Sequence, residues 1–336
     1  METMDLSTWL PLGLMAVMGL ALLAYVVLDG YDLGVGLLMP FAAETDQDVM
    51  VASIGPFWDA NETWLVLGVG LLLVAFPHAH GVVLSALYLP VTVMLVGLIL
   101  RGVAFEFRAK AQAAHRRLWN ALFSVGSLVA ALAQGWMLGA YVTGFAPGIW
   151  AQCFSLGVAL TLPAAYALLG AGWLLMKTEG ALQRQALAWG RAAFWPMVLA
   201  LLGISLATPV VSPTVMDKWF SMPGLLLLLP VPGACAVALA AIHHVLHRPR
   251  TVVAGYGGLV FLGTVLLFVL AFLGLAYSLY PYVVIDRLTV WQAASATESL
   301  RVIAIGLGLT LPVIVGYTVF LYRVFGGKAQ ALSYGG

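Results

Sequence analysis

Two pairs of acidic residues interrupt apolar sequence early in the chain, and proton exchange is the chemistry they could perform. Asp29 and Asp32 lie three residues apart, and Asp59 and Glu62 have the same spacing. Residues three apart share one face of a helix, so each pair could bring two carboxyls together. An apolar setting and a second acid nearby both favour the protonated form of a carboxyl, so that it can take up and release protons. These four acids are therefore the candidate proton path.

Both pairs also have ordinary structural interpretations, which the sequence leaves open. The first pair could end an apolar run as solvated acids at a membrane surface. The second pair follows Pro56, which suits the first position of a helix, and acids in a first turn favour the helix dipole. The sequence around the second pair, however, also contains Trp58, Asn61 and Trp64. It therefore has more polar and aromatic side chains than helix capping requires. We expect these three residues to support the acids.

A basic residue inside a later apolar run is the expected partner of these acids. Arg101 lies deep in the predicted third membrane span, and Glu106 follows it nearer the water. A charge in a span is costly, so Arg101 either pairs with an acid of a neighbouring span or extends to the surface. We predict supporting roles for both residues.

The histidines and cysteines predict neither a haem nor a metal site in this chain. A haem held across a helix bundle needs ligands well inside the membrane on facing helices. The six histidines lie near predicted span ends; His243 and His247 have metal-pair spacing, but no third ligand accompanies them. Cys153 and Cys235 lie in apolar runs and do not suggest a disulfide framework.

The composition indicates an integral membrane protein. Of 336 residues, 62% are hydrophobic and 9% charged, and the mean hydropathy is +1.01. A typical soluble domain is only about 45–50% apolar and about 25% charged. The net charge of +1 gives no sign of a nucleic-acid partner.

Long apolar runs predict an all-α fold with about nine transmembrane helices, which could form two four-helix bundles and one peripheral helix. The whole chain, 1–336, is then one membrane domain. The expected spans are 9–30, 62–80, 83–105, 119–142, 150–176, 193–211, 222–246, 255–280 and 302–325.

The distribution of Lys and Arg predicts the orientation. Basic residues gather in 106–118, 177–191, 247–250 and the C-terminal segment, with exceptions at Lys218, Arg287 and Arg301. Positive loops stay in the cytoplasm, so the N-terminus is expected outside and the C-terminus inside. The loop expected over 31–57 would be cytoplasmic although it has no Lys or Arg.

Three motifs resemble subunit II of the cytochrome bd-type quinol oxidases. They are DGYDLGVG over 29–36, SIGPFWDANETWL over 53–65 and RGVAFEFR over 101–108. The first two are specific together at this spacing, and most of the specificity lies in the first 110 or so residues. Several features resemble the cyanide-insensitive branch.

The resemblance implies a multi-pass, haem-poor subunit of an oxidase in the bacterial inner membrane, which oxidises quinol and reduces oxygen without pumping protons. In that family the haems, of type b and/or d, belong to subunit I. The resemblance further implies a proton entry at the acid of the W-D motif, here Asp59, with Asp29 and Asp32 as associates. Glu62 is a further member of the path, at a position where the family varies. A small single-helix subunit and a structural quinone occur in such complexes, but no motif here identifies a quinone site.

Two other functional classes fit the residues alone. A stand-alone proton-coupled transporter would also use acids inside the membrane, although no inverted repeat is evident. A structural scaffold with inert acids is the third interpretation.

Overall fold

The computed structural model describes residues 6–110 and 112–329, and it is built almost entirely from helices. The long helices are α1 (Leu6–Leu38), α3 (Trp58–Ala75), α4 (Pro77–Lys110), α5 (Ala113–Val142), α6 (Ile149–Lys177), α7 (Gly180–Val211), α10 (Pro230–His247), α12 (Gly258–Leu279) and α14 (Thr297–Val324). The shorter elements are η1 (Met39–Phe41), α2 (Glu44–Ile54), α8 (Pro213–Phe220), α9 (Gly224–Leu228), α11 (Pro249–Thr251), η2 (Val252–Tyr256), β1 (Tyr282–Val284), β2 (Leu288–Thr289) and α13 (Val290–Ala293).

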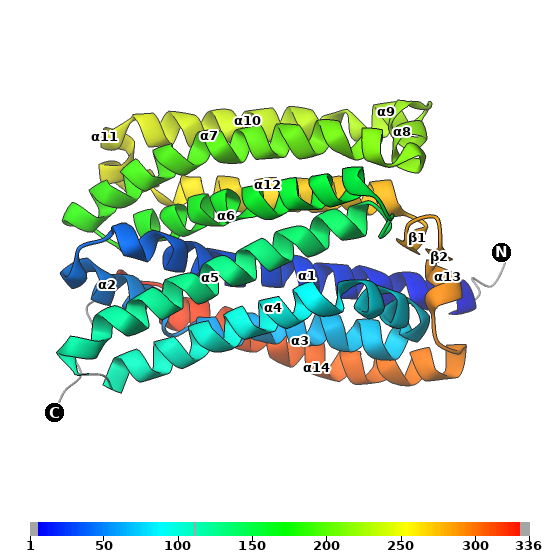
Figure 1. The fold of residues 1–336 in the computed structure, drawn as a ribbon, viewed down its shortest axis with the longest axis horizontal. Helices are drawn as coiled ribbons and strands as arrows, with labels where there is room; N and C mark the ends of the chain where they lie inside the picture. The colour runs from blue at the N-terminus through cyan, green and yellow to red at the C-terminus, as the bar shows by residue number, and fades with distance from the viewer. Residues whose placement is uncertain (1–5, 111, 330–336) are drawn as a thin grey trace.

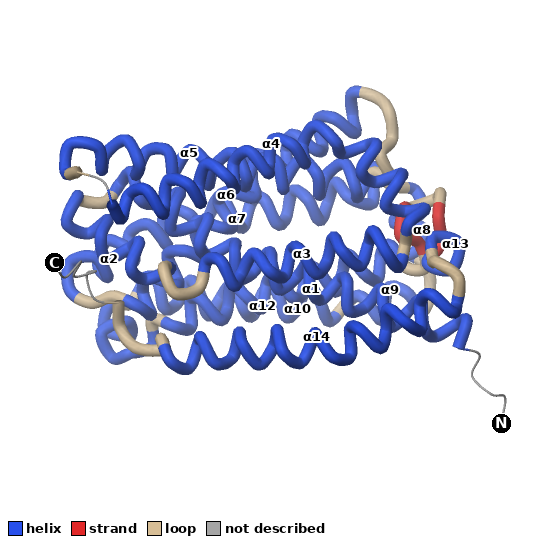
Figure 2. The backbone as a smooth tube through the Cα atoms, turned by 90° about the horizontal axis from the view of Figure 1, so that it is seen from below, coloured by secondary structure: helices blue, strands red, loops and turns tan. Residues whose placement is uncertain are grey.

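The long helices lie roughly parallel (Figure 1), and their contacts divide them into two groups with α14 at the edge. Helices α1, α3, α4 and α5 form the first group, and α6, α7, α10 and α12 form the second. Contacts of α6 with both α1 and α5 join the groups, while α14 packs against α1 and α3. Figure 2 shows α14 along one edge of the molecule. The fold is therefore the all-α polytopic membrane fold that the sequence predicts.

The number of membrane-spanning helices is eight or nine within the described ranges. Eight helices are long and apolar enough to cross a bilayer, and α2 and α3 together can form one further, bent span with an angle of 49°. The second predicted span, 62–80, was displaced: α3 begins at Trp58 and ends at Ala75, and α4 starts directly at Pro77. Asp59 and Glu62 are thus both helical.

Helix α1 is longer than its predicted span, so the loop expected over 31–57 was wrong. The helix continues without a break through the glycine-rich segment to Leu38, and η1 and α2 occupy most of the rest. The glycines serve helix packing here. A Cβ on Gly34 would lie 1.9 Å from the backbone oxygen of Tyr166, and one on Gly170 would lie 2.5 Å from the carbonyl carbon of Gly34. Helices α1 and α6 cross at this point with their backbones in contact.

This crossing predicts that alanine substitutions at two glycines of α1 will differ sharply in their effect on stability. We expect Gly34→Ala to lower the stability of the fold by about 1–3 kcal/mol, because the added methyl must displace the backbone of α6. Gly13→Ala is the matched control, since a Cβ there meets no atom within 4 Å. Thermal unfolding of the purified complexes measures both, and equal midpoints would contradict the close crossing.

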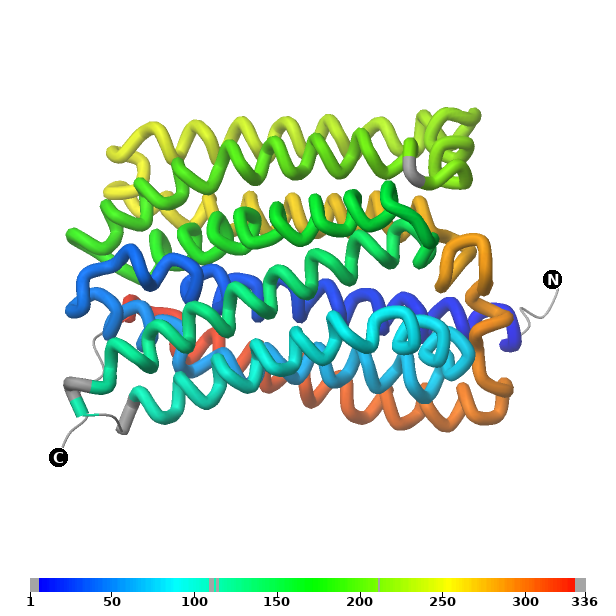
Figure 3. Tube along the Cα trace, in the orientation of Figure 1, coloured from blue at the N-terminus to red at the C-terminus, as the bar shows by residue number. Residues whose placement is uncertain are grey.

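Basic side chains gather at one end of the molecule, which we call the basic end. It carries Arg108, Arg116, Arg117, Lys177 and Lys328, at the ends of α4 to α6 and after α14. Figure 3 shows the described C-terminal residues at this end and the start of α1 at the other. Lys218, Arg287 and Arg301 belong to the opposite end.

Candidate functional site

Arg101 is the centre of a buried charge cluster between three helices of the first bundle. Its side chain is only 1% exposed. Its guanidinium pairs with Asp29 of α1, at 2.6 Å between Nη1 and Oδ1, and also with Glu62 of α3. Asp29 is fully buried, whereas Glu62 is 29% exposed. The acids and the arginine that the sequence predicts as partners therefore meet in one place.

Close packing of α4 on α5 holds Arg101 at this depth. A Cβ on Gly126 of α5 would lie 2.6 Å from the backbone oxygen of Gly97 and 2.9 Å from the backbone nitrogen of Arg101. Arg101 precedes Arg108, at the basic end, by two helical turns, which is about 10 Å along the helix axis. The guanidinium is therefore fixed inside the bundle, and the possibility that it extends to the surface is excluded.

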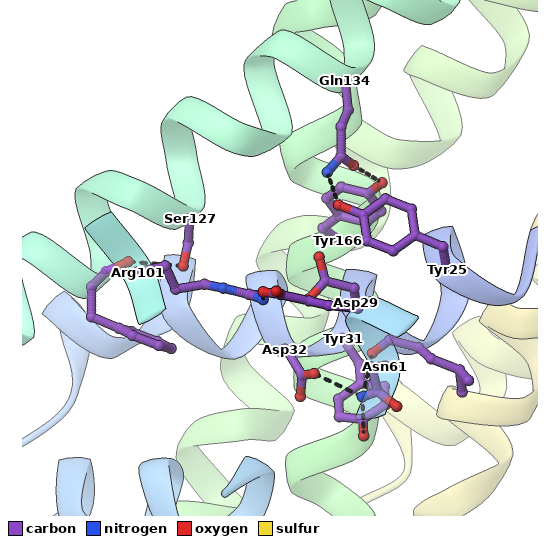
Figure 4. Close-up of polar contacts among 12 residues, drawn as sticks. Tyr25, Asp29, Tyr31, Asp32, Asn61, Arg101, Ser127, Gln134 and Tyr166 are labelled. Carbon is purple, nitrogen blue, oxygen red and sulfur yellow. Dashed lines mark hydrogen bonds and ion pairs between the residues drawn. The ribbon is translucent and has the colours of Figure 1, made fainter. Parts of the chain in front are cut away.

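Asn61 links the second buried acid to two tyrosines. Its Nδ2 donates to Oδ2 of Asp32 at 2.8 Å and to the hydroxyl of Tyr31 at 3.0 Å. The hydroxyl of Tyr322, on α14, donates to Oδ1 of Asn61 at 3.2 Å and lies 2.7 Å from the Tyr31 hydroxyl. In Figure 4, dashed lines join the amide nitrogen of Asn61 to Asp32 and to the Tyr31 hydroxyl. This chain of groups runs from Asp32 toward the C-terminal helix.

A second polar chain leads away from Asp29 toward α5 and α6. The hydroxyl of Tyr25 lies near Asp29 and accepts from Nε2 of Gln134 at 2.8 Å. Tyr166 donates to the other side of the same amide, with 2.5 Å between its hydroxyl and Oε1. All of these side chains are buried (Figure 4). A polar chain this deep in apolar surroundings is stable only when its donors and acceptors form hydrogen bonds with one another.

The cluster has more acids than cations and leaves some polar atoms unpaired. Asp29, Asp32 and Glu62 stand against the single guanidinium of Arg101. Among the described residues, Oδ1 of Asp32 and Nε of Arg101 have no hydrogen-bond partner. Buried polar atoms usually have partners, and an internal water is the ordinary partner where protein groups supply none.

Asp59 lies outside the buried cluster but next to it. It is in the first turn of α3, one turn before Glu62, and its side chain is exposed. Trp58 covers the neighbouring surface with its ring against Phe105, 5.1 Å between centroids. Asp59 is thus at the open end of a series of charged groups that continues inward.

The remaining predicted residues are divided between the cluster and the surface. Trp64 is buried, with an indole N–H that has no described partner. Glu106 is exposed on α4, and the described contacts of the cluster do not include it. The alternative of solvated acids at the end of the first span is excluded for Asp29 and Asp32, because α1 continues beyond them and both side chains are fully buried.

Sequence reasoning missed the tyrosines and the glutamine. Tyr31 sits between the two acids of the first motif, and Gln134 is a lone amide in an apolar run, so both carried a signal. Tyr322 carried none, because its contact with Tyr31 joins residues 291 positions apart.

The described histidines lie at helix ends rather than across a bundle. His78 and His80 are in the first turn of α4, His115 is near the start of α5, and the rest are in the last turns of α10. The rings of His243 and His247 stack with their centroids 4.0 Å apart. Within residues 6–110 and 112–329, no group of three or more His, Cys, Asp or Glu could hold a metal ion. This arrangement of histidines does not fit a haem held across a bundle.

The comparison with protein families decides the assignment. Residues 10–325 match the family model of cytochrome bd terminal oxidase subunit II. The chain belongs to this family. The resemblance seen in the three motifs is thereby confirmed over nearly the whole length of this subunit II.

Individual relatives agree with the family. The chain is 28% identical to cytochrome bd ubiquinol oxidase subunit 2 of Bacillus subtilis over 328 residues, which cover 90% of this chain and 91% of the relative. It is 33% identical to cytochrome bd-I ubiquinol oxidase subunit 2 of Escherichia coli over 129 residues, 38% of this chain and 34% of that one. Its fold is similar to a chain of the bd oxidase from Geobacillus thermodenitrificans, with a TM-score of 0.78, 19% identity and coverage of 95% and 99% of the two chains.

This subunit II is therefore a multi-pass membrane component of a bd-type quinol oxidase, an oxidoreductase complex of the bacterial respiratory chain. Its relatives are second subunits, which associate with a subunit I. Complexes of this family carry haems.

Proposed function

We propose that this subunit II is an accessory subunit that leads protons from the cytoplasm toward the haem-bearing subunit I. The support is the series Asp59, Glu62, Arg101 and Asp29, which runs from an exposed acid through a half-buried one to a fully buried pair. Asp59 and Glu62 are one helical turn apart, and Arg101 forms ion pairs with both Glu62 and Asp29. Carboxyls inside a membrane protein are costly and mark proton relays.

The excess of acids in the cluster suits this role. One guanidinium balances one carboxylate, and further negative charge in a dry bundle is strongly unfavourable. Protons bound by the other carboxyls remove that charge. The unpaired atoms of Asp32 and Arg101 suit internal waters, which would connect the cluster for proton transfer.

The proposal includes the rest of the complex. The haems of type b and/or d belong to the partner subunit I, where quinol is oxidised and oxygen reduced. Some complexes of the family also contain a small single-helix subunit or a structural quinone. The basic end lies in the cytoplasm of a bacterial cell, with the N-terminus outside, because Lys and Arg favour the inner side.

A substitution at the entry tests the proposal. We expect Asp59→Asn to slow oxygen uptake at least about tenfold, which corresponds to about 1.4 kcal/mol in the barrier, while the haem spectrum stays unchanged. Asn cannot bind and release a proton, yet it keeps the size of the side chain. Uptake by the purified complex with saturating quinol measures the effect, and undiminished uptake would refute the entry role and favour the inert scaffold.

The stand-alone transporter does not fit a chain of this family. Its relatives are subunits of an oxidase, and a transporter would purify without a haem-bearing partner. Purification of the gently solubilised complex distinguishes the two classes.

A further inference from the structure

Lys177, the last residue of α6, anchors the C-terminal segment Phe325–Ala329. The Lys177 side chain is only 4% exposed. Its ammonium donates to the backbone oxygens of Phe325 and Gly327, the latter at 3.1 Å. The backbone N–H of Ala329 donates to the oxygen of Lys177 at 2.8 Å, so the segment is bound to the end of α6 from both sides.

Lys328 adds further contacts between the same two segments. Its ammonium donates to the backbone oxygen of Thr178 at 3.1 Å and lies 3.9 Å from a carboxylate oxygen of Glu179. The described partners of the Lys177 ammonium, in contrast, are neutral: two carbonyls and two aromatic rings. A buried ammonium used in this way is costly, and it fixes the position of the groups that surround it.

The anchored segment contacts an aromatic cluster, because the ring of Phe325 lies 6.2 Å from that of Phe57 between centroids. The Lys177 ammonium lies 5.2 Å from the ring centroid of Phe57 and 5.0 Å from that of Trp173. The Phe57 ring packs on Tyr322, with centroids 4.7 Å apart, and Trp173 stacks on Tyr31 at 4.1 Å. Phe57, Trp173 and Tyr31 are each no more than 1% exposed.

Polar groups begin directly beneath this cluster. The hydroxyls of Tyr31 and Tyr322 bond to Asn61, and Asn61 bonds to Asp32. A short chain of hydroxyl and amide groups thus connects the buried acid with the underside of the C-terminal segment. At the basic end, this is a second approach to the acids, separate from the one at Asp59.

We propose that residues 325–329, fixed by Lys177, seal this second approach, so that protons reach the buried acids only by way of Asp59 and Glu62. The proposal rests on the proton-carrying function above. Lys177 is then a positioning residue that keeps water away from Tyr322 and Asn61. A relay with a single entrance takes up protons from one side of the membrane and at one site.

Accessibility tests the seal without reference to proton transfer. Ser53 is 2% exposed, and its backbone oxygen accepts from the indole of Trp173, directly below Lys177. We would introduce Ser53→Cys into the full complex, with Cys153 and Cys235 replaced by alanine, and measure reaction with a water-soluble maleimide. Lys177→Met should speed labelling at least about tenfold, because local opening admits water and reagent. Arg323→Met, which removes an exposed cation of α14, is the control and should leave labelling slow.

A bypass experiment tests the function of the seal. We expect Lys177→Met to raise the oxygen uptake of the Asp59→Asn complex, because an open second approach lets protons reach Asp32 through Tyr322. A chain that ends at Val324 should do the same, and it serves if Lys177→Met fails to assemble. Slow labelling in both variants overturns the seal, and fast labelling without faster uptake overturns its role in proton entry. If Asp59→Asn by itself does not slow uptake, the proposed function fails, whereas the labelling result still decides whether the segment is a seal.

Discussion

Replacing Arg101 with methionine is expected to lower the free energy of unfolding of the subunit by about 3–5 kcal/mol, the usual loss when one partner of a buried ion pair is removed. Among the residues that the structure describes, Arg101 forms the ion pair with Asp29, and both side chains are almost fully buried. Without it, Asp29 must remain as an unpaired charge or take up a proton. Thermal unfolding of the complex, followed by haem absorbance and by retention of both subunits, measures the loss.

The matched variant removes both members of the pair. Asp29→Asn together with Arg101→Met leaves Glu62 without its partner, but that carboxyl is partly exposed and reaches water. We expect the double variant to be clearly more stable than Arg101→Met alone, because the buried carboxylate of Asp29 is no longer left without its cation. If the two substitutions simply add, Arg101 and Asp29 are not coupled and the cluster is wrongly described.

Replacing Glu62 with glutamine is expected to slow oxygen reduction at least about tenfold with little loss of stability. Glutamine can still accept a hydrogen bond from Arg101, so the contact between α3 and α4 persists. It cannot bind and release protons, however, and in the proposed relay Glu62 is the step between exposed Asp59 and buried Asp29. Oxygen uptake and thermal unfolding, measured on one preparation, separate the two effects.

Two further variants control this result. Glu62→Asp keeps a titratable group one methylene shorter and should retain part of the activity. Asp46→Asn removes an acid of α2 at the same end of the molecule, outside the described contacts of the cluster, and should leave uptake unchanged. If Asp46→Asn and Glu62→Gln slow uptake alike, surface charge at the basic end explains the effect better than a proton path.

The sequence predicts the class of fold and the members of the cluster because both depend on local patterns. Long apolar runs mark the helices, and a few charges inside such runs are conspicuous because the membrane makes them costly. Asp29, Glu62 and Arg101 were singled out on this basis, and the structure brings all three into contact.

The burial of Asp29 and Asp32 inside the helix bundle could not be predicted from such local patterns. The glycines around Asp29 and Asp32 look like a helix end, but α1 continues because Gly34 packs against the backbone of α6. Such a contact depends on a helix more than a hundred residues away. The link from Tyr31 to Tyr322, and the anchoring of Phe325 by Lys177, likewise join distant segments that no local pattern connects.

Proton uptake itself is the most direct test of the relay. Complexes in vesicles, reduced with quinol and then given a pulse of oxygen, report uptake through a pH-sensitive dye on the side that carries the basic end. We predict that Asp59→Asn slows this uptake at least about tenfold while the haems are reduced at the normal rate. Uptake as fast as in the unaltered complex would show that the protons take another route, and it would contradict the function proposed for Asp59, Glu62 and the buried acids.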